Sequence, residues 1–179
     1  MKTVKLKDKE FKVSINSEQI QEAVKNIANN INKDFDNEPK TPLFVSILNG
    51  SFMFTADLFK NLTINCEVSF LKLASYKGTE STGSVKQLIG FNENVKGRKI
   101  IVLEDIVDSG VTLEKIVAEL TKFEPTEIKI ATLLYKPDSY KKNIPVDYIG
   151  IKIPNDFIVG YGLDYDGLGR NLSDIYTVI

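Results

Sequence analysis

Residues 100–112 read IIVLEDIVDSGVT. The apolar run from Lys99 to Leu103 is rich in branched residues, which is typical of a strand covered on both faces of a sheet. Behind the acidic turn, apolar residues recur at the spacing of a helix: Leu113, Ile116, Val117, Leu120 and Phe123. The segment therefore predicts a buried strand, an acidic turn and a helix, a unit from which α/β proteins are built.

The turn gathers three carboxylates and two hydroxyls at the carboxyl end of the predicted strand. In open α/β sheets ligands bind beyond this end, and the N-terminus of the next helix offers unpaired N–H groups to an anion, so a phosphate would fit against residues 109–112. Glu104 and Asp105 need polar partners because a buried, unpaired carboxylate is costly. Two ribose hydroxyls and a magnesium ion would supply them. The alternative is an ordinary acidic loop in which Asp108 or Ser109 only caps the helix.

Further strands and helices alternate along the chain. Helices are predicted from Ser17 to Asp34, capped by Asn16 or Ser17, and from Phe52 to Leu62. Strands are predicted over four more segments: Leu43–Leu48, Glu67–Leu73, Glu127–Leu134 and Val146–Ile151. Residues 75–84 are rich in Gly, Ser and Thr without periodicity, so we expect a mobile loop there. The alternation predicts an α/β fold with a mostly parallel central sheet flanked by helices.

The tail from Pro154 to Ile179 departs from this alternation. It contains no linker or low-complexity tract, so we expect it to cap the same domain. A chain of 179 residues fits one domain of common size, and we expect residues 1–179 to form that single domain.

The composition excludes several classes of function. A net charge of -1 argues against the broad basic surface of a nucleic-acid-binding protein. The single Cys66 cannot form an intramolecular disulfide, so a reducing cytoplasm is the simpler expectation. No stretch approaches the about 18 apolar residues of a membrane span, and residues 1–11 lack the apolar core of a signal peptide. The absence of histidine excludes Ser-His-Asp and Cys-His nucleophiles and leaves carboxylates, lysine and hydroxyls for acid–base chemistry.

Residues 104–112 resemble the ribose-phosphate-binding motif of the phosphoribosyltransferases, and the chain from Lys5 to Ile179 resembles the hypoxanthine-guanine branch of that family. Further segments match the branch in order: Leu48–Ser51, Ser75–Tyr76 with Ser81–Gly83, Leu134–Lys136 and Pro154–Tyr165, with Arg170 at the matching distance. Ordered matches over nearly the whole chain are far more specific than Asp-Ser-Gly alone. The resemblance implies the type I phosphoribosyltransferase fold with a small hood from the N-terminal and C-terminal segments, in which residues 154–179 help to bind the base.

The resemblance also implies an enzyme of 6-oxopurine salvage with Mg²⁺ as its cofactor. It would transfer the 5-phosphoribosyl group from phosphoribosyl pyrophosphate to hypoxanthine, to guanine or to both. Xanthine is a further possible base. The products would be the nucleoside monophosphate (IMP or GMP) and pyrophosphate. Asp108 would be the general acid/base at a purine ring nitrogen. The ribose phosphate would be bound by seven residues: Glu104, Asp105, Asp108, Ser109, Gly110, Val111 and Thr112. The metal would be held by three carboxylates: Glu104, Asp105 and Asp164.

By the same resemblance, the purine would be bound by Lys136, Phe157, Ile158 and Asp164. Lys136 would donate to the exocyclic oxygen of the base and reject adenine, which presents a donor there. Phe157 would stack on the ring, the main chain of Ile158 would meet its edge, and Asp164 would hold a second magnesium ion that bridges to pyrophosphate. Judged alone, these residues have ordinary alternatives: a solvated lysine, a core phenylalanine and a loop carboxylate in solvent.

Pyrophosphate would be bound by Asn49, Gly50 and Arg170. Relatives often carry a lysine where this chain has Asn49, in a turn whose peptide is commonly cis, so the contacts of that lysine do not transfer to this chain. Ser75 and Tyr76 would open a flexible loop that closes over the site. The resemblance further implies a homodimer or homotetramer.

The main alternative is a non-catalytic or regulatory nucleotide-binding protein on the same fold, such as the pyrimidine-operon attenuators, which bind RNA through a basic face. The neutral charge and the purine-type Lys136 and Phe157 argue against it. An unrelated nucleotide-binding module is disfavoured because the chain has no Walker loop and no G-x-G-x-x-G after a strand.

Overall fold

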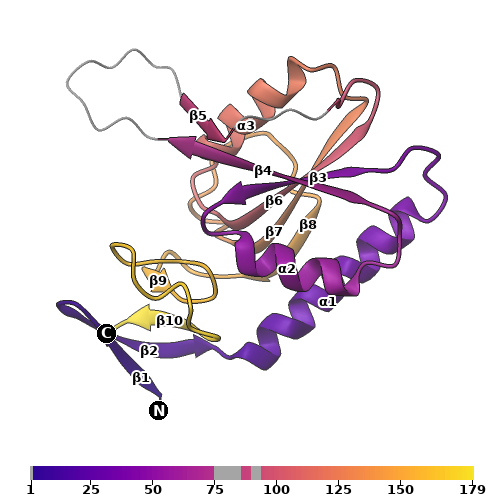
Figure 1. The fold of residues 1–179 in the computed structure, drawn as a ribbon. Helices are drawn as coiled ribbons and strands as arrows, with labels where there is room; N and C mark the ends of the chain where they lie inside the picture. The colour runs from indigo at the N-terminus through magenta and orange to yellow at the C-terminus, as the bar shows by residue number, and fades with distance from the viewer. Residues whose placement is uncertain (1, 75–85, 90–93) are drawn as a thin grey trace.

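The computed structural model describes residues 2–74, 86–89 and 94–179, which form two sheets and three helices (Figure 1). The larger sheet has six strands in the order β5-β4-β3-β6-β7-β8. Its strands are β3 (Leu43–Leu48), β4 (Glu67–Ala74), β5 (Lys86–Ile89), β6 (Lys99–Val107), β7 (Glu127–Tyr135) and β8 (Tyr148–Lys152). All neighbouring pairs are parallel except β4 and β5. The predicted α/β class with a mostly parallel central sheet is confirmed.

The three helices divide the hydrophobic core into two layers, one on each face of this sheet. On one face, α1 (Ser17–Phe35) and α2 (Phe52–Asn61) pack against residues such as Phe44 and Leu103. On the other face, α3 (Val111–Thr121) packs against residues such as Val45 and Val102. Because both faces are covered, β3 and most of β6 are buried, which accounts for their nearly continuous apolar sequences.

The predicted start of α1 is confirmed, and Asn16 is its cap. The side-chain oxygen of Asn16 accepts a hydrogen bond of 2.9 Å from the backbone N–H of Gln19, whose side chain accepts one of 3.0 Å from the backbone N–H of Asn16. This reciprocal pair satisfies two N–H groups that the first turn leaves without helical partners.

The smaller sheet joins the two ends of the chain. Its order is β1-β2-β10-β9, formed by β1 (Thr3–Leu6), β2 (Lys9–Ile15), β9 (Ile158–Val159) and β10 (Ile175–Val178), all antiparallel. Phe11, Val159 and Tyr176 form its own buried cluster. Figure 1 shows this sheet as a separate layer beyond the end of the large sheet from which β6 leads into α3. We call this layer the hood.

Several predicted boundaries were wrong by a few residues, and one difference matters for function. The strand expected to end at Leu103 continues to Val107, because β7 pairs with β6 as far as Val107 opposite Tyr135. Glu104 and Asp105 therefore lie on the strand rather than in a loop after it. The predicted mobile loop of residues 75–84 falls outside the described residues. Within the described part of the chain, no helix is long and apolar enough to cross a membrane.

Candidate active site

The C-terminal end of β6 carries two neighbouring acids. Glu104 is buried, and its burial, together with the charge of Asp105, raises its pKa well above the ordinary value. Burial also raises the pKa of Asp105 to about 6, against the opposing effect of a 2.9 Å hydrogen bond that its Oδ1 accepts from the N–H of Ile106. Two carboxylates that are costly to ionise here would gain from polar or cationic groups of a ligand.

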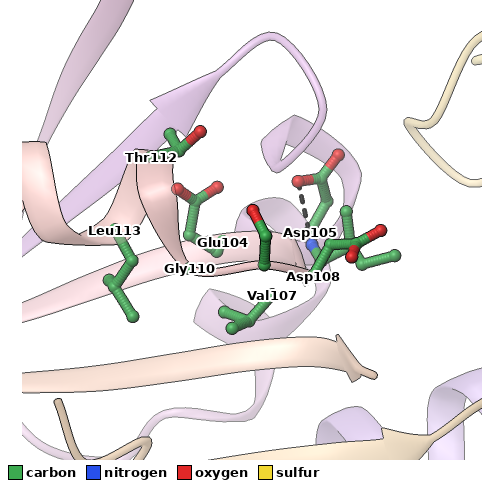
Figure 2. A pocket seen from close by; sticks show the side chains of 9 residues that line it. Glu104, Asp105, Val107, Asp108, Gly110, Thr112 and Leu113 are labelled. Atoms are coloured by element: carbon green, nitrogen blue, oxygen red, sulfur yellow. Dashed lines mark hydrogen bonds between the residues drawn. The ribbon is translucent and has the colours of Figure 1, made fainter. Parts of the chain in front are cut away.

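A cavity of ≈ 260 Å³ lies over this strand end and the turn after it. It is lined by residues 104–110 together with Thr112 and Leu113. Figure 2 shows the side chains of Val107 and Leu113 pointing away from Glu104 and Thr112, and both are buried in the core under α3. The acidic and hydroxyl side chains therefore line the cavity. All seven residues predicted to bind the ribose phosphate lie at this strand end or in the turn and first helical residues after it, and all but Val111 line the cavity.

Gly110 shapes the entry into α3. Its φ of 83° is left-handed, and it is the N-cap, with no side-chain hydrogen bond that caps the helix. A Cβ on Gly110 would lie 2.5 Å from the ring of Tyr140, so only glycine fits between the turn and that ring. The first backbone N–H groups of α3 are therefore available to an anion in the cavity.

A second cavity of ≈ 390 Å³ adjoins the first and shares Asp105, Ile106 and Asp108 with it. It reaches from the strand ends to the hood and is lined by Gly50, Asp105, Ile106, Asp108, Lys136, Asp156, Phe157, Ile158, Leu163, Asp164 and Arg170. The structure thus brings together all four residues predicted to bind the purine.

Lys136 is not the solvated surface lysine of the ordinary alternative, because the residue is only 8% exposed. Its Nζ lies 2.9 Å from Oδ2 of Asp108, a residue that lines both cavities, so a cation of the second cavity stands beside a carboxylate that the two cavities share. Phe157 is 45% exposed rather than buried in the core, which leaves ring surface for a ligand.

At the other end of the second cavity, Arg170 and Asp164 form an ion pair of 2.5 Å. Nη1 of Arg170 also donates to the carbonyl of Gly162 at 2.6 Å, and Asp164 accepts from the N–H of Gly167 at 2.7 Å. Both side chains are therefore oriented by the loop that carries them.

The Leu48–Asn49 peptide is cis, as is common in the family that the sequence resembles. Gly50 lines the second cavity, whereas Asn49 is exposed and is not among the residues that line either cavity. The structure therefore brings Gly50 and Arg170 together and does not bring Asn49 with them. Ser75 and Tyr76 lie outside the described residues.

Sequence reasoning missed several features of the site. Ile106, Asp156 and Leu163 line the second cavity; all three stand in matched segments, but nothing in their pattern gave them a role. Under the Asn49–Gly50 turn, three buried hydroxyls form a chain: Ser46 Oγ lies 2.8 Å from Ser51 Oγ and 2.7 Å from Thr55 Oγ1. A serine inside the apolar strand β3 was the available signal for this network.

The acidic side chains of the site could bind magnesium only together with oxygen atoms of a bound ligand. Among residues 2–74, 86–89 and 94–179, no group of three or more acidic or cysteine side chains could hold a metal ion alone. Mg²⁺ commonly binds through one or two carboxylates plus ligand oxygens, and Glu104 with Asp105 offers such a pair at the first cavity. These two acids therefore fit a metal that arrives with a phosphorylated sugar.

Comparison with known proteins identifies the family. The family model described as a phosphoribosyl transferase domain matches residues 16–166. The chain is 42% identical to the hypoxanthine-guanine phosphoribosyltransferase of Lactococcus lactis, over 90% of this chain and 87% of that protein. It is 38% identical to the hypoxanthine phosphoribosyltransferase of Escherichia coli K12, over 93% of this chain and 94% of that protein.

Comparison with a solved structure supports the same family. The hypoxanthine-guanine phosphoribosyltransferase of Bacillus anthracis superposes with a TM-score of 0.84 at 39% identity, covering 94% of this chain and 96% of that one. The type I phosphoribosyltransferase fold and the enzyme class implied by the sequence are confirmed, and the regulatory alternative is not favoured. The chain belongs to the phosphoribosyltransferase family, in its hypoxanthine-guanine branch.

Proposed function

We propose that this enzyme transfers the 5-phosphoribosyl group of phosphoribosyl pyrophosphate to hypoxanthine, guanine or both, with xanthine as a third candidate base. The observation that carries the proposal is that the two cavities share Asp108, whose carboxylate lies 2.9 Å from the ammonium of Lys136 in the second cavity. The sugar phosphate would occupy the cavity over the turn, and the purine would occupy the cavity under the hood.

In the proposed reaction a ring nitrogen of the purine forms a bond to C1′ of the sugar as the bond from C1′ to pyrophosphate breaks. Asp108 would hold or move the proton of the purine ring nitrogen, and its carboxylate would also stabilise the positive charge that develops on the sugar. Lys136, 2.9 Å from Asp108 in the free protein, would turn its ammonium to the exocyclic oxygen of the base. Adenine would place a donor against that ammonium and leave both unpaired.

The remaining predicted residues would bind and orient the substrates. The N-terminus of α3 and the hydroxyls of Ser109 and Thr112 would hold the 5′-phosphate. Arg170 would bind pyrophosphate with its forked donors, next to Gly50. Glu104, Asp105 and Asp164 would hold Mg²⁺, which supplies charge neutralisation for the pyrophosphate when bound. Residues 154–179 would act as part of a base-binding hood within one domain, in a protein that works in the cytoplasm.

We also propose that the enzyme is a homodimer or homotetramer, assembled through the face of β4 that carries Val68 and Phe70. Val68 and Phe70 pair with Phe44 and Ser46 of β3, which α2 covers, yet they are 38% and 39% exposed. The sheet surface next to them is covered by α2, whereas these two apolar side chains are left exposed. Exposed apolar surface of this kind favours contact with a second copy of the chain. Light scattering on the purified protein should give a mass of two or four times 20.1 kDa; a monomer would contradict this part of the proposal.

Pyrophosphate release with phosphoribosyl pyrophosphate, Mg²⁺ and each base tests the function. We expect turnover with hypoxanthine or guanine and none above background with adenine. Asp108→Asn should slow turnover by about 10²-fold or more and leave binding of ribose 5-phosphate largely intact. Equal losses of turnover and binding would assign Asp108 to binding instead, and turnover with adenine alone would refute the proposed base.

A further inference from the structure

The N-terminal hairpin of the hood lies against the segment that carries Phe157, Asp164 and Arg170 (Figure 1). Its turn, between β1 and β2, makes two polar contacts with this segment. Asp8 Oδ1 accepts a hydrogen bond of 2.7 Å from the hydroxyl of Tyr165, and Lys7 forms an ion pair with Asp166. The hairpin and the loop at residues 164–170 are thus linked although they are more than 150 residues apart in the sequence.

Three residues of this hairpin and this loop lie against the ring of Phe157. Tyr165 meets it edge to face, with ring centroids 5.8 Å apart at 83°. Phe11, itself fully buried in the hood, lies 6.3 Å away at 42°. The ammonium of Lys9 lies 5.4 Å from the centroid of Phe157 and 5.2 Å from that of Tyr165, within the range of a cation–π contact.

These contacts support Phe157 from outside the purine cavity. Phe157 lines the cavity of ≈ 390 Å³, whereas Lys9, Phe11 and Tyr165 are not among its described lining residues. A half-exposed phenylalanine without such neighbours would sample several ring orientations, and a ligand that stacks on it would have to order the ring on binding. A ring that is already held in place avoids this cost, so its supporting residues affect affinity without touching the ligand.

We propose that Lys9 and Tyr165 are positioning residues that hold the ring of Phe157 in the orientation that stacks on the purine. The inference rests on the proposed function and goes beyond it, because it gives the N-terminal hairpin a part in recognition of the base. Lys9 acts through the ring of Phe157 and not through the phosphate. Its contribution therefore appears only with ligands that contain a base.

The test compares a ligand with a base and a ligand without one, both carrying a 5′-phosphate. In calorimetric titrations, Lys9→Met should raise the Kd of IMP about 3-fold and leave the Kd of ribose 5-phosphate unchanged. Methionine keeps the apolar stem of the side chain and removes its charge. Lys9→Arg should restore the affinity for IMP, because arginine keeps the cation over the ring. Lys12→Met, an exposed position on the same strand, removes the same charge and should change neither constant.

Tyr165 provides a second, independent variant. Tyr165→Leu removes the ring edge from Phe157 and should weaken IMP alone, whereas Tyr165→Phe keeps the ring and should bind IMP within about 2-fold of wild type. Wild-type affinity of Lys9→Met and Tyr165→Leu for IMP would overturn the positioning role while leaving the proposed function intact. An equal weakening of ribose 5-phosphate would overturn it too, by assigning Lys9 to the phosphate. A wild-type protein that binds ribose 5-phosphate but not IMP would refute the proposed function itself.

Discussion

Gly50 allows the turn after β3 to lie directly against Asp105. A Cβ on residue 50 would lie 1.6 Å from Oδ2 and 2.4 Å from Cγ of Asp105. Ordinary contact begins at 3.4 Å, so in Gly50→Ala the carboxylate would have to withdraw by about 1.8 Å, the difference between the two distances. The backbone itself accepts alanine, because Gly50 is not among the glycines with positive φ. Any effect of the substitution therefore comes from the displaced carboxylate or the displaced turn.

We expect Gly50→Ala to lower kcat/KM for phosphoribosyl pyrophosphate by at least about 100-fold, because a misplacement of about 1 Å in a site can cost that much. The carboxylate cannot move without loss, since it is held by the N–H of Ile106 at 2.9 Å. Pyrophosphate release at varied substrate concentration measures the effect, and calorimetry with ribose 5-phosphate shows whether sugar binding is lost as well. Circular dichroism on heating reports whether the variant folds.

The double variant Gly50→Ala/Asp105→Ala separates the clash from other effects. It removes the atoms that alanine at position 50 would meet, so its melting temperature should exceed that of Gly50→Ala, while its activity stays low because the site acid is gone. Gly50→Ala would contradict this expectation if it kept kcat/KM within about 3-fold of wild type and bound ribose 5-phosphate normally. That result would mean that the position of Asp105 does not control the site.

Two further predictions concern the charged groups of the site. Lys136→Met should lower kcat/KM for hypoxanthine by about 10- to 100-fold, because it removes a charge-assisted hydrogen bond to the base. Pyrophosphate-release assays with each base measure this effect, and Lys141→Met serves as an exposed control. An unchanged kcat/KM would mean that Lys136 does not recognise the base. The pKa of Asp105 is raised from 3.8 to about 6, so between these pH values the folded protein keeps a proton that the unfolded chain has released. The ligand-free protein should therefore lose about 2 kcal/mol of stability relative to Asp105→Asn as pH rises from 4 to 6, measured by urea unfolding. Parallel pH profiles for the two proteins would contradict this.

Local sequence was sufficient for most elements because each carried its own signal. The apolar run of β3 and the period of α1 predicted their strand and helix closely, and the apolar run from residue 99 predicted the first half of β6. The end of β6 was missed because acids at positions 104 and 105 look like the start of a loop. Pairing with β7 and the burial of Glu104 override that local preference.

The sequence alone determined the family, the fold class and the set of candidate residues at the acidic turn, because these depend on ordered motifs and on the hydrophobic period of each element. Only the tertiary structure decided that Lys136 is buried against Asp108, that Gly50 lies against Asp105 and that Lys9 lies over Phe157. These contacts join residues from 28 to more than 140 positions apart. No local pattern encodes such pairs, since they form only when the strand ends and the hood converge on the same cavities.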